Sequence, residues 1–72
     1  MAHLTHHNQN DRLIRMPDVE GLTGLRRSRI YELVNQGLFP RQIRIVGSSH
    51  WSFGEIQQWI ADRKAERDLA AA

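Results

Sequence analysis

The chain has 72 residues, of which 40% are hydrophobic and 25% charged, so it forms one small domain at most. The absence of cysteine excludes disulfides, thiol catalysis and cysteine-based zinc sites. No apolar run approaches the roughly 20 residues that a membrane helix needs, and no signal-peptide pattern opens the chain. We therefore expect a cytoplasmic protein without membrane contact. The chain is also too short to enclose a deep pocket for a small-molecule substrate.

Basic charge is concentrated in the middle of the chain. The formal net charge is only +2, but residues 25–45 hold five arginines against Glu32 alone, a net of +4, while each flanking segment has a net of −1. Nine of the ten basic residues are arginine, whose planar guanidinium suits bidentate recognition of phosphate and guanine. The pattern indicates a polyanionic partner that touches one region, with a merely solvated basic surface as the alternative.

Residues 1–11 are polar and show no hydrophobic periodicity, so we expect a disordered arm followed by one domain over residues 12–69. The arm contains His3, His6 and His7. Nothing fixes the geometry of these histidines, so no metal site is expected.

A short helix is expected to open the domain. Pro17 suits its first turn, and Asp18 and Glu20 favour the positive end of its dipole. Val19 and Leu22 are spaced to share one buried side, and Gly24 ends the helix.

A second helix is expected from about Arg27 to Gln36, ended by Gly37. Its apolar stripe follows the i, i+3, i+4 spacing and consists of Ile30, Leu33 and Val34. Two short helices joined by a three- or four-residue turn that contains glycine form a helix-turn-helix.

A small hairpin is expected next. Ile43 and Ile45 alternate with polar residues, which indicates a half-buried strand; residues 47–49 form a turn, and residues 50–52 return as the second strand. Trp51 and Trp59 are expected in the core.

The S-x-x-E motif at residues 52–55 is a capping box that opens a third helix. Its apolar positions are Ile56, Trp59 and Ile60. This helix is expected to end between Arg67 and Leu69.

The order helix, turn, helix, hairpin, helix predicts a mainly helical fold with a small β-hairpin, a winged helix-turn-helix. One helix fits the major groove of B-form DNA, and an arginine-bearing hairpin contacts the backbone or an adjacent minor groove. The candidate DNA-binding residues are Arg26, Arg27, Ser28, Arg29, Tyr31 and Asn35 on the helix, and Arg41, Arg44, Ser48, Ser49 and His50 on the wing.

For several of these residues an alternative stays open. Arg41 and Arg44 are also explained as charges that protect a strand edge, and Tyr31 either donates to phosphate or covers the core edge. Glu32 either accepts a hydrogen bond from cytosine or pairs with Arg29 or Ser28 within the helix, and the pairing is favoured.

Residues 12–60 resemble the AlpA family of prophage regulatory proteins, which is related to small phage excisionases and more distantly to MerR-type DNA-binding domains. The resemblance is carried by R-L-I-R-M-P-D-V, T-G-L-R-R-S-R-I-Y, G-L-F-P-R and W-S-F-G-E-I-Q-Q-W-I, in that order. It implies a winged helix-turn-helix that binds double-stranded DNA near an integrated element. Its recognition-helix residues correspond to Arg27, Ser28, Arg29, Tyr31 and Glu32, and its wing to residues 44–50.

The chain departs from the family pattern at three positions. Arg26 replaces a helix-capping Ser, Arg29 replaces a common Thr, and Gln42 replaces a frequent Pro. Loss of a capping Ser costs about 1 kcal/mol, so contact with phosphate is a reason to tolerate an arginine there.

The resemblance implies a regulator of integrase or excisionase expression. The alternatives are an architectural excisionase that binds attachment-site DNA and a protein-interaction adaptor. Integrase, or further copies of the chain on adjacent sites, are possible protein partners. The serines are not accompanied by a general base and an acidic residue that would orient it, as in a catalytic triad. We therefore expect no enzyme activity and no cofactor.

Overall fold

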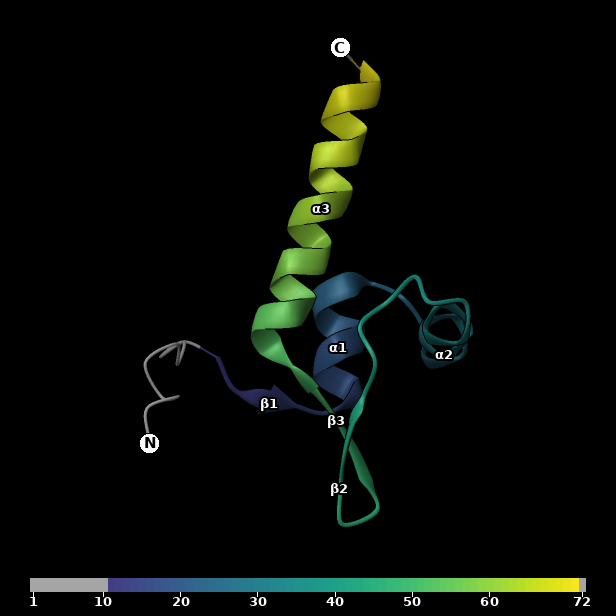
Figure 1. Ribbon diagram of the computed structural model, residues 1–72, viewed down its shortest axis with the longest axis vertical. Helices are drawn as coiled ribbons and strands as arrows, with labels where there is room; N and C mark the ends of the chain where they lie inside the picture. Colours follow the sequence, from purple (N-terminus) through teal and green to yellow (C-terminus); the bar gives the residue numbers. More distant parts are fainter. Residues whose placement is uncertain (1–10, 72) are drawn as a thin grey trace.

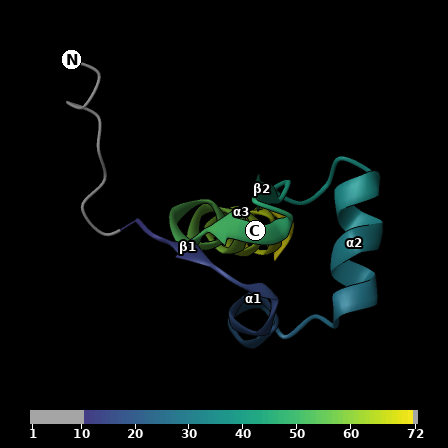
Figure 2. The same cartoon turned by 90° about the horizontal axis from the view of Figure 1, so that it is seen from below.

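The protein folds into three helices and a three-stranded antiparallel sheet, as seen in a computed structural model that describes residues 11–71 (Figure 1). The elements are β1 (Leu13–Ile14), α1 (Met16–Thr23), α2 (Arg27–Asn35), β2 (Ile43–Ile45), β3 (Ser48–Ser52) and α3 (Phe53–Ala71). The strand order is β1-β3-β2, and β2 and β3 form a hairpin that extends beyond the helices. α2 runs across the direction of α3, which is viewed end-on in Figure 2. The expected winged helix-like, mainly helical fold is confirmed.

The helix-turn-helix forms as expected, with a glycine after each helix. Gly24 has a φ of 75° and donates its N–H to the carbonyl of Glu20 at 2.7 Å, which ends α1. Gly37, also at a φ of 75°, donates to the carbonyl of Val34 at 3.0 Å just beyond α2. Both glycines occupy the left-handed region, which they enter without the steric cost that other residues incur.

The first strand was not expected from the sequence. β1 pairs with β3 so that Leu13 lies opposite Ser52 and Ile14 opposite Trp51. Two residues are too few to show the alternation by which a strand is recognised, and their partners lie far along the chain. The sheet therefore has one strand more than the expected hairpin.

The tip of the hairpin also differs from the expectation. The turn residues are Val46 and Gly47, with φ values of 46° and 84°, and β3 already begins at Ser48. Two positive φ values in a two-residue hairpin loop are typical of a type I′ turn. A valine in the left-handed region costs about 1–2 kcal/mol, because its Cβ crowds the following carbonyl. The turn expected at residues 47–49 is thus wrong.

Among residues 11–71, six buried hydrophobic side chains form the core. They are Ile14, Val19, Ile30, Phe39, Trp51 and Ile56. Trp51 is completely buried and donates its indole N–H to the carbonyl of Pro40 at 3.1 Å, which confirms its expected position. Three side chains that we expected to be buried are partly exposed: Leu22 at 38%, Ile43 at 40% and Ile45 at 38%. The two isoleucines are exposed because both lie on the face of the hairpin opposite the buried Trp51.

Trp59 lies at the rim of the core and is half-buried. Its ring meets the ring of Phe39 edge-on at 4.8 Å, and its indole N–H donates to the carbonyl of Leu38 at 2.8 Å. The expected core position of Trp59 is therefore only partly correct.

The start of α3 is held by two polar side chains. Ser52 accepts a hydrogen bond from the N–H of Glu55 at 3.1 Å, as the S-x-x-E motif predicts. The carboxylate of Asp11 accepts hydrogen bonds from the Ser52 hydroxyl at 3.0 Å and from the N–H of Gly54 at 2.8 Å. We expected Asp11 in the arm, and this is wrong for that residue. The rest of the arm, residues 1–10 with its three histidines, lies outside the described residues.

α3 is longer than expected and continues to Ala71 rather than ending near Leu69. Residues 61–71 are mostly Ala, Arg, Lys and Glu, which have the highest helix propensities and sustain a helix beyond the core. Within residues 11–71, no helix combines the length and the apolarity needed to cross a membrane.

Candidate nucleic-acid interface

The exposed face of α2 carries polar side chains around a shallow hollow. The hollow is lined by Ser28, Arg29, Tyr31, Glu32 and Asn35. Four of the predicted DNA-binding residues are among them. The opposite face holds the fully buried Ile30, so α2 presents its polar side outward because its apolar side is fixed in the core.

Arg29 and Glu32 form an ion pair on this face. The Nη1 atom of Arg29 lies 2.8 Å from Oε1 of Glu32, and both side chains are more than half exposed. This is the intrahelical pairing that was favoured for Glu32. An exposed pair one helical turn apart contributes only about 0.3–0.5 kcal/mol, so a phosphate or a base is able to replace the carboxylate.

The N-terminus of α2 is capped from α1 rather than by its own N-cap side chain. Arg26 occupies the N-cap position and makes no capping hydrogen bond. Instead, Glu20 accepts a hydrogen bond from the N–H of Arg27 at 2.9 Å through Oε2. We had assigned Glu20 to the dipole of its own helix, so its role at α2 was missed. Its carboxylate satisfies one of the N–H groups left without a partner at the start of the helix and opposes the positive end of the helix dipole.

A row of ring contacts connects α2 to the sheet. The guanidinium of Arg27 lies 5.9 Å from the centre of the Tyr31 ring. The Tyr31 ring is in turn 6.1 Å from the ring of the buried Trp51, at an angle of 55°. Tyr31 is half-buried and covers the edge of the core, while one side of it remains on the hollow.

The wing presents an arginine on the same side. Arg44 lies opposite Ser49 in the hairpin, and its Nη1 donates to the Ser49 hydroxyl at 3.1 Å. Because side chains alternate along a strand, Ser49 shares a sheet face with Trp51 two residues later. Tyr31 packs against Trp51, so this face carries Arg44 on the wing and leads across the rings to Arg27 on α2. The structure therefore brings the two arginines to one side of the sheet.

Two other predicted wing residues lie on the opposite face. Ser48 pairs with Ile45 and His50 with Ile43, and all four alternate away from Arg44. Nδ1 of His50 is 3.4 Å from the carbonyl oxygen of Ser48. The predicted wing set is thus divided between the two faces of the hairpin.

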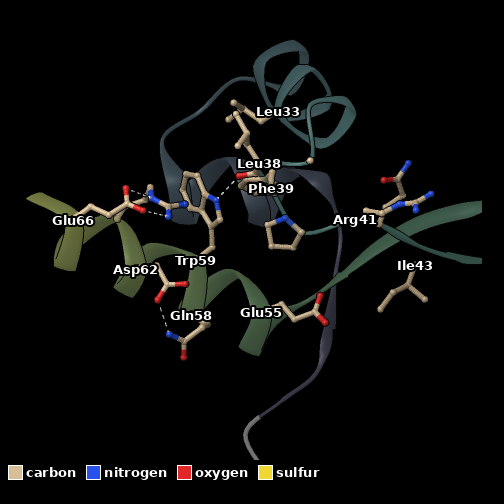
Figure 3. A pocket seen from close by; sticks show the side chains of 14 residues that line it. Leu33, Leu38, Phe39, Arg41, Ile43, Glu55, Gln58, Trp59, Asp62 and Glu66 are labelled. Carbon is tan, nitrogen blue, oxygen red and sulfur yellow. Dashed lines mark hydrogen bonds and ion pairs between the residues drawn. The ribbon is translucent and has the colours of Figure 1, made fainter.

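Arg41 lies apart from the α2 hollow, in a groove between the segment after α2 and one side of α3 (Figure 3). Besides Arg41, the groove is lined by Leu33, Gly37, Leu38, Phe39, Pro40, Gln42, Ile43, Glu55, Gln58, Trp59, Asp62, Arg63 and Glu66. Glu66 accepts hydrogen bonds from Arg63, and this contact raises the pKa of that guanidinium. Three carboxylates and two arginines line the groove, so it lacks the excess of positive charge that a polyanion requires.

A comparison with protein-family models shows which family the chain belongs to. Residues 12–64 match the family model described as prophage CP4-57 regulatory protein (AlpA). The chain belongs to the AlpA family. The resemblance noted from its four sequence segments is confirmed, and the match spans both helices of the helix-turn-helix, the whole wing and the first half of α3. Membership in this family supports a phage-type regulatory protein that binds DNA.

Among curated proteins, the chain is similar to "Uncharacterized protein ORF88" of Enterobacteria phage P4. The two are 43% identical over 58 residues, which cover 79% of this chain and 66% of that relative. The chain thus spans slightly less than two thirds of the length of the relative. No solved structure matches it.

Proposed function

We propose that the protein is a double-stranded DNA-binding regulator of a prophage or integrative element, which acts in the cytoplasm on integrase or excisionase expression. The observation that carries this proposal is the placement of Arg27 of α2 and Arg44 of the wing on one side of the sheet. In the proposed complex, α2 enters the major groove and the wing lies on the backbone or in the adjacent minor groove.

The chemistry of the α2 face suits base readout. Arginine forms two hydrogen bonds with guanine, asparagine forms two with adenine, and serine is able to hydrogen-bond to either base. Arg29, Asn35 and Ser28 supply these groups around the hollow. Glu32 holds Arg29 in the free protein and so positions that guanidinium before DNA arrives.

The size of the module indicates several copies on DNA. A single module of this kind buries about 600–1,000 Å² of protein surface. Tight and specific occupancy then requires further copies on adjacent sites or a second DNA-bound protein such as integrase.

The test is footprinting across the genomic neighbourhood of the protein's own gene, followed by affinity measurements against salt on the footprinted duplex and on a scrambled one. We expect the footprinted duplex to bind at least about 10³-fold more tightly than the scrambled one. We also expect affinity to fall with salt by a log–log slope of about 0.9 for each phosphate contacted. Folded protein with no measurable affinity for any duplex at low salt contradicts the proposal.

The same footprints separate the regulator from an architectural excisionase. One footprint upstream of a promoter supports the regulator, whereas several evenly spaced footprints near an attachment site support the excisionase. The binding of integrase without DNA supports the adaptor.

A further inference from the structure

The tip of the wing exposes an apolar side chain. Val46 is 99% exposed, the highest exposure among the large hydrophobic residues of the described chain. It lies at the turn of the hairpin, at the end of the molecule opposite the C-terminus of α3 (Figure 1).

Val46 does not stabilise the fold that displays it. Its side chain is fully in water, so it buries no apolar surface. Its φ of 46° lies in the left-handed region, where a β-branched residue is strained and where Asn, Asp or Gly is favoured in a type I′ turn. An asparagine at this position would reduce the backbone strain and would expose no apolar side chain to water. Since the valine contributes nothing to stability within the chain, we look for its role in a contact with another molecule.

The surroundings of Val46 indicate DNA as the contact. Arg44 lies two residues before it and is held by Ser49 on the face that leads to Arg27. The minor groove is about 6 Å wide and carries a negative potential that attracts arginine. A single side chain at a hairpin tip fits this width, and Val46 is that side chain. Apolar side chains inserted there partly unstack a base step and bend the duplex.

We propose that Val46 is a wedge that enters the minor groove beside the site read by α2, opens a base step and bends the DNA. This inference rests on the proposed function, since it requires that the protein bind a duplex. The wedge also predicts a sequence preference at a base step that no polar side chain contacts. The step under the wing tip should be a flexible pyrimidine–purine step, such as TA or CA.

The experiment compares three variants with the wild type on an end-labelled duplex that carries the footprinted site. Val46→Asn replaces the wedge by a polar residue that tolerates the left-handed region, and Val46→Leu keeps an apolar side chain. Leu69→Asn is the matched control, because Leu69 is 78% exposed on α3, far from the wing. The measurements are affinity, bending by energy transfer between the ends of the duplex, and the melting temperature of the free protein.

We expect Val46→Asn to weaken binding about tenfold, as when one apolar side chain stays in water, and to abolish the bend. We also expect it to raise the melting temperature of the free protein by about 4 °C. A merely structural role for Val46 would lower that temperature instead. Val46→Leu should keep both affinity and bend, and Leu69→Asn should change neither.

The wedge is overturned if wild type and Val46→Asn bind with equal affinity and equal bend; the proposed function then stands and the tip is free for a protein contact. A wild-type protein that binds the site without bending it also overturns the wedge. A wild-type protein that binds no duplex removes the proposed function itself, which is a different result.

Discussion

Glu20 and Arg27 connect the two helices of the helix-turn-helix at the point where α2 begins. The Oε2 atom of Glu20 accepts a hydrogen bond from the backbone N–H of Arg27 at 2.9 Å. The residue before, Arg26, offers no capping group, and no acid lies in the first turn of α2. A carboxylate from α1 therefore satisfies an N–H at the start of α2, in a helix whose own N-cap side chain satisfies none.

Glu20→Ala is expected to destabilise the protein by about 1 kcal/mol, the usual contribution of one hydrogen bond. For a domain of this size that lowers the melting temperature by about 4–8 °C. Glu20→Gln keeps an acceptor oxygen and loses only the charge, so its melting temperature should lie between those of the wild type and the Ala variant. Thermal unfolding followed by circular dichroism checks the order. Equal melting temperatures for all three proteins would show that this hydrogen bond does not hold α2.

Asp11→Ala is expected to cost about 1–2 kcal/mol, because two donors at the start of α3, the Ser52 hydroxyl and the Gly54 N–H, lose their acceptor. Denaturant unfolding measures the loss. A double-mutant cycle with Ser52→Ala checks the cause: the two losses should add up to clearly more than the loss in the double variant, since both residues act in one network. Strictly additive losses would argue against a shared cap.

Most of the fold is predictable because its signals are local. Gly24 and Gly37 end their helices, and Ser52 begins α3, through hydrogen bonds to residues within a few positions along the chain. These signals depend on the preference of one residue for one backbone conformation, which the sequence displays directly.

The features that the sequence did not predict depend on contacts between residues distant in sequence, or on which face of a strand is exposed to solvent. β1 pairs with residues more than 35 positions away, and Asp11 binds Ser52 at a separation of 41. Ile43 and Ile45 alternate like a half-buried strand, yet their face of the hairpin is the one opposite Trp51, and alternation alone does not show which face is covered. Val46 carries no turn signal, since a β-branched residue is the least expected occupant of a left-handed position.

The sequence predicted which residues belong to the candidate site, but it did not predict that the wing residues are divided between the two faces of the hairpin. Helical periodicity alone is enough to group the α2 residues around one hollow. The separation of Ser48 and His50 from Arg44 depends on the register of the hairpin, and a one-residue change in register exchanges the two faces.

Glu32→Gln is expected to strengthen binding to all duplexes. The substitution removes the ion pair that holds Arg29 and one negative charge from the face of α2. Affinity at low salt should rise several-fold on both the footprinted and the scrambled duplex, and the ratio between them should fall, because a freed arginine binds phosphate without regard to sequence. Titrations at several salt concentrations measure both quantities. A loss of affinity confined to the footprinted duplex would instead assign Glu32 to a base contact.

Arg44→Ala is expected to weaken binding to every sequence alike and to reduce the salt slope by about 1, the effect of losing one phosphate contact. Ser49→Ala should give a smaller loss with an unchanged slope, because it removes the hydroxyl that positions Arg44 but keeps the charge. The control is Arg67→Ala, which removes the same charge from an exposed ion pair on α3. If the slope changes equally for Arg44→Ala and Arg67→Ala, the wing makes no phosphate contact and the salt dependence reflects only net charge.

By contrast, Arg27→Ala should reduce the preference for the footprinted duplex over the scrambled one, because an arginine at the start of α2 is placed to meet a base edge.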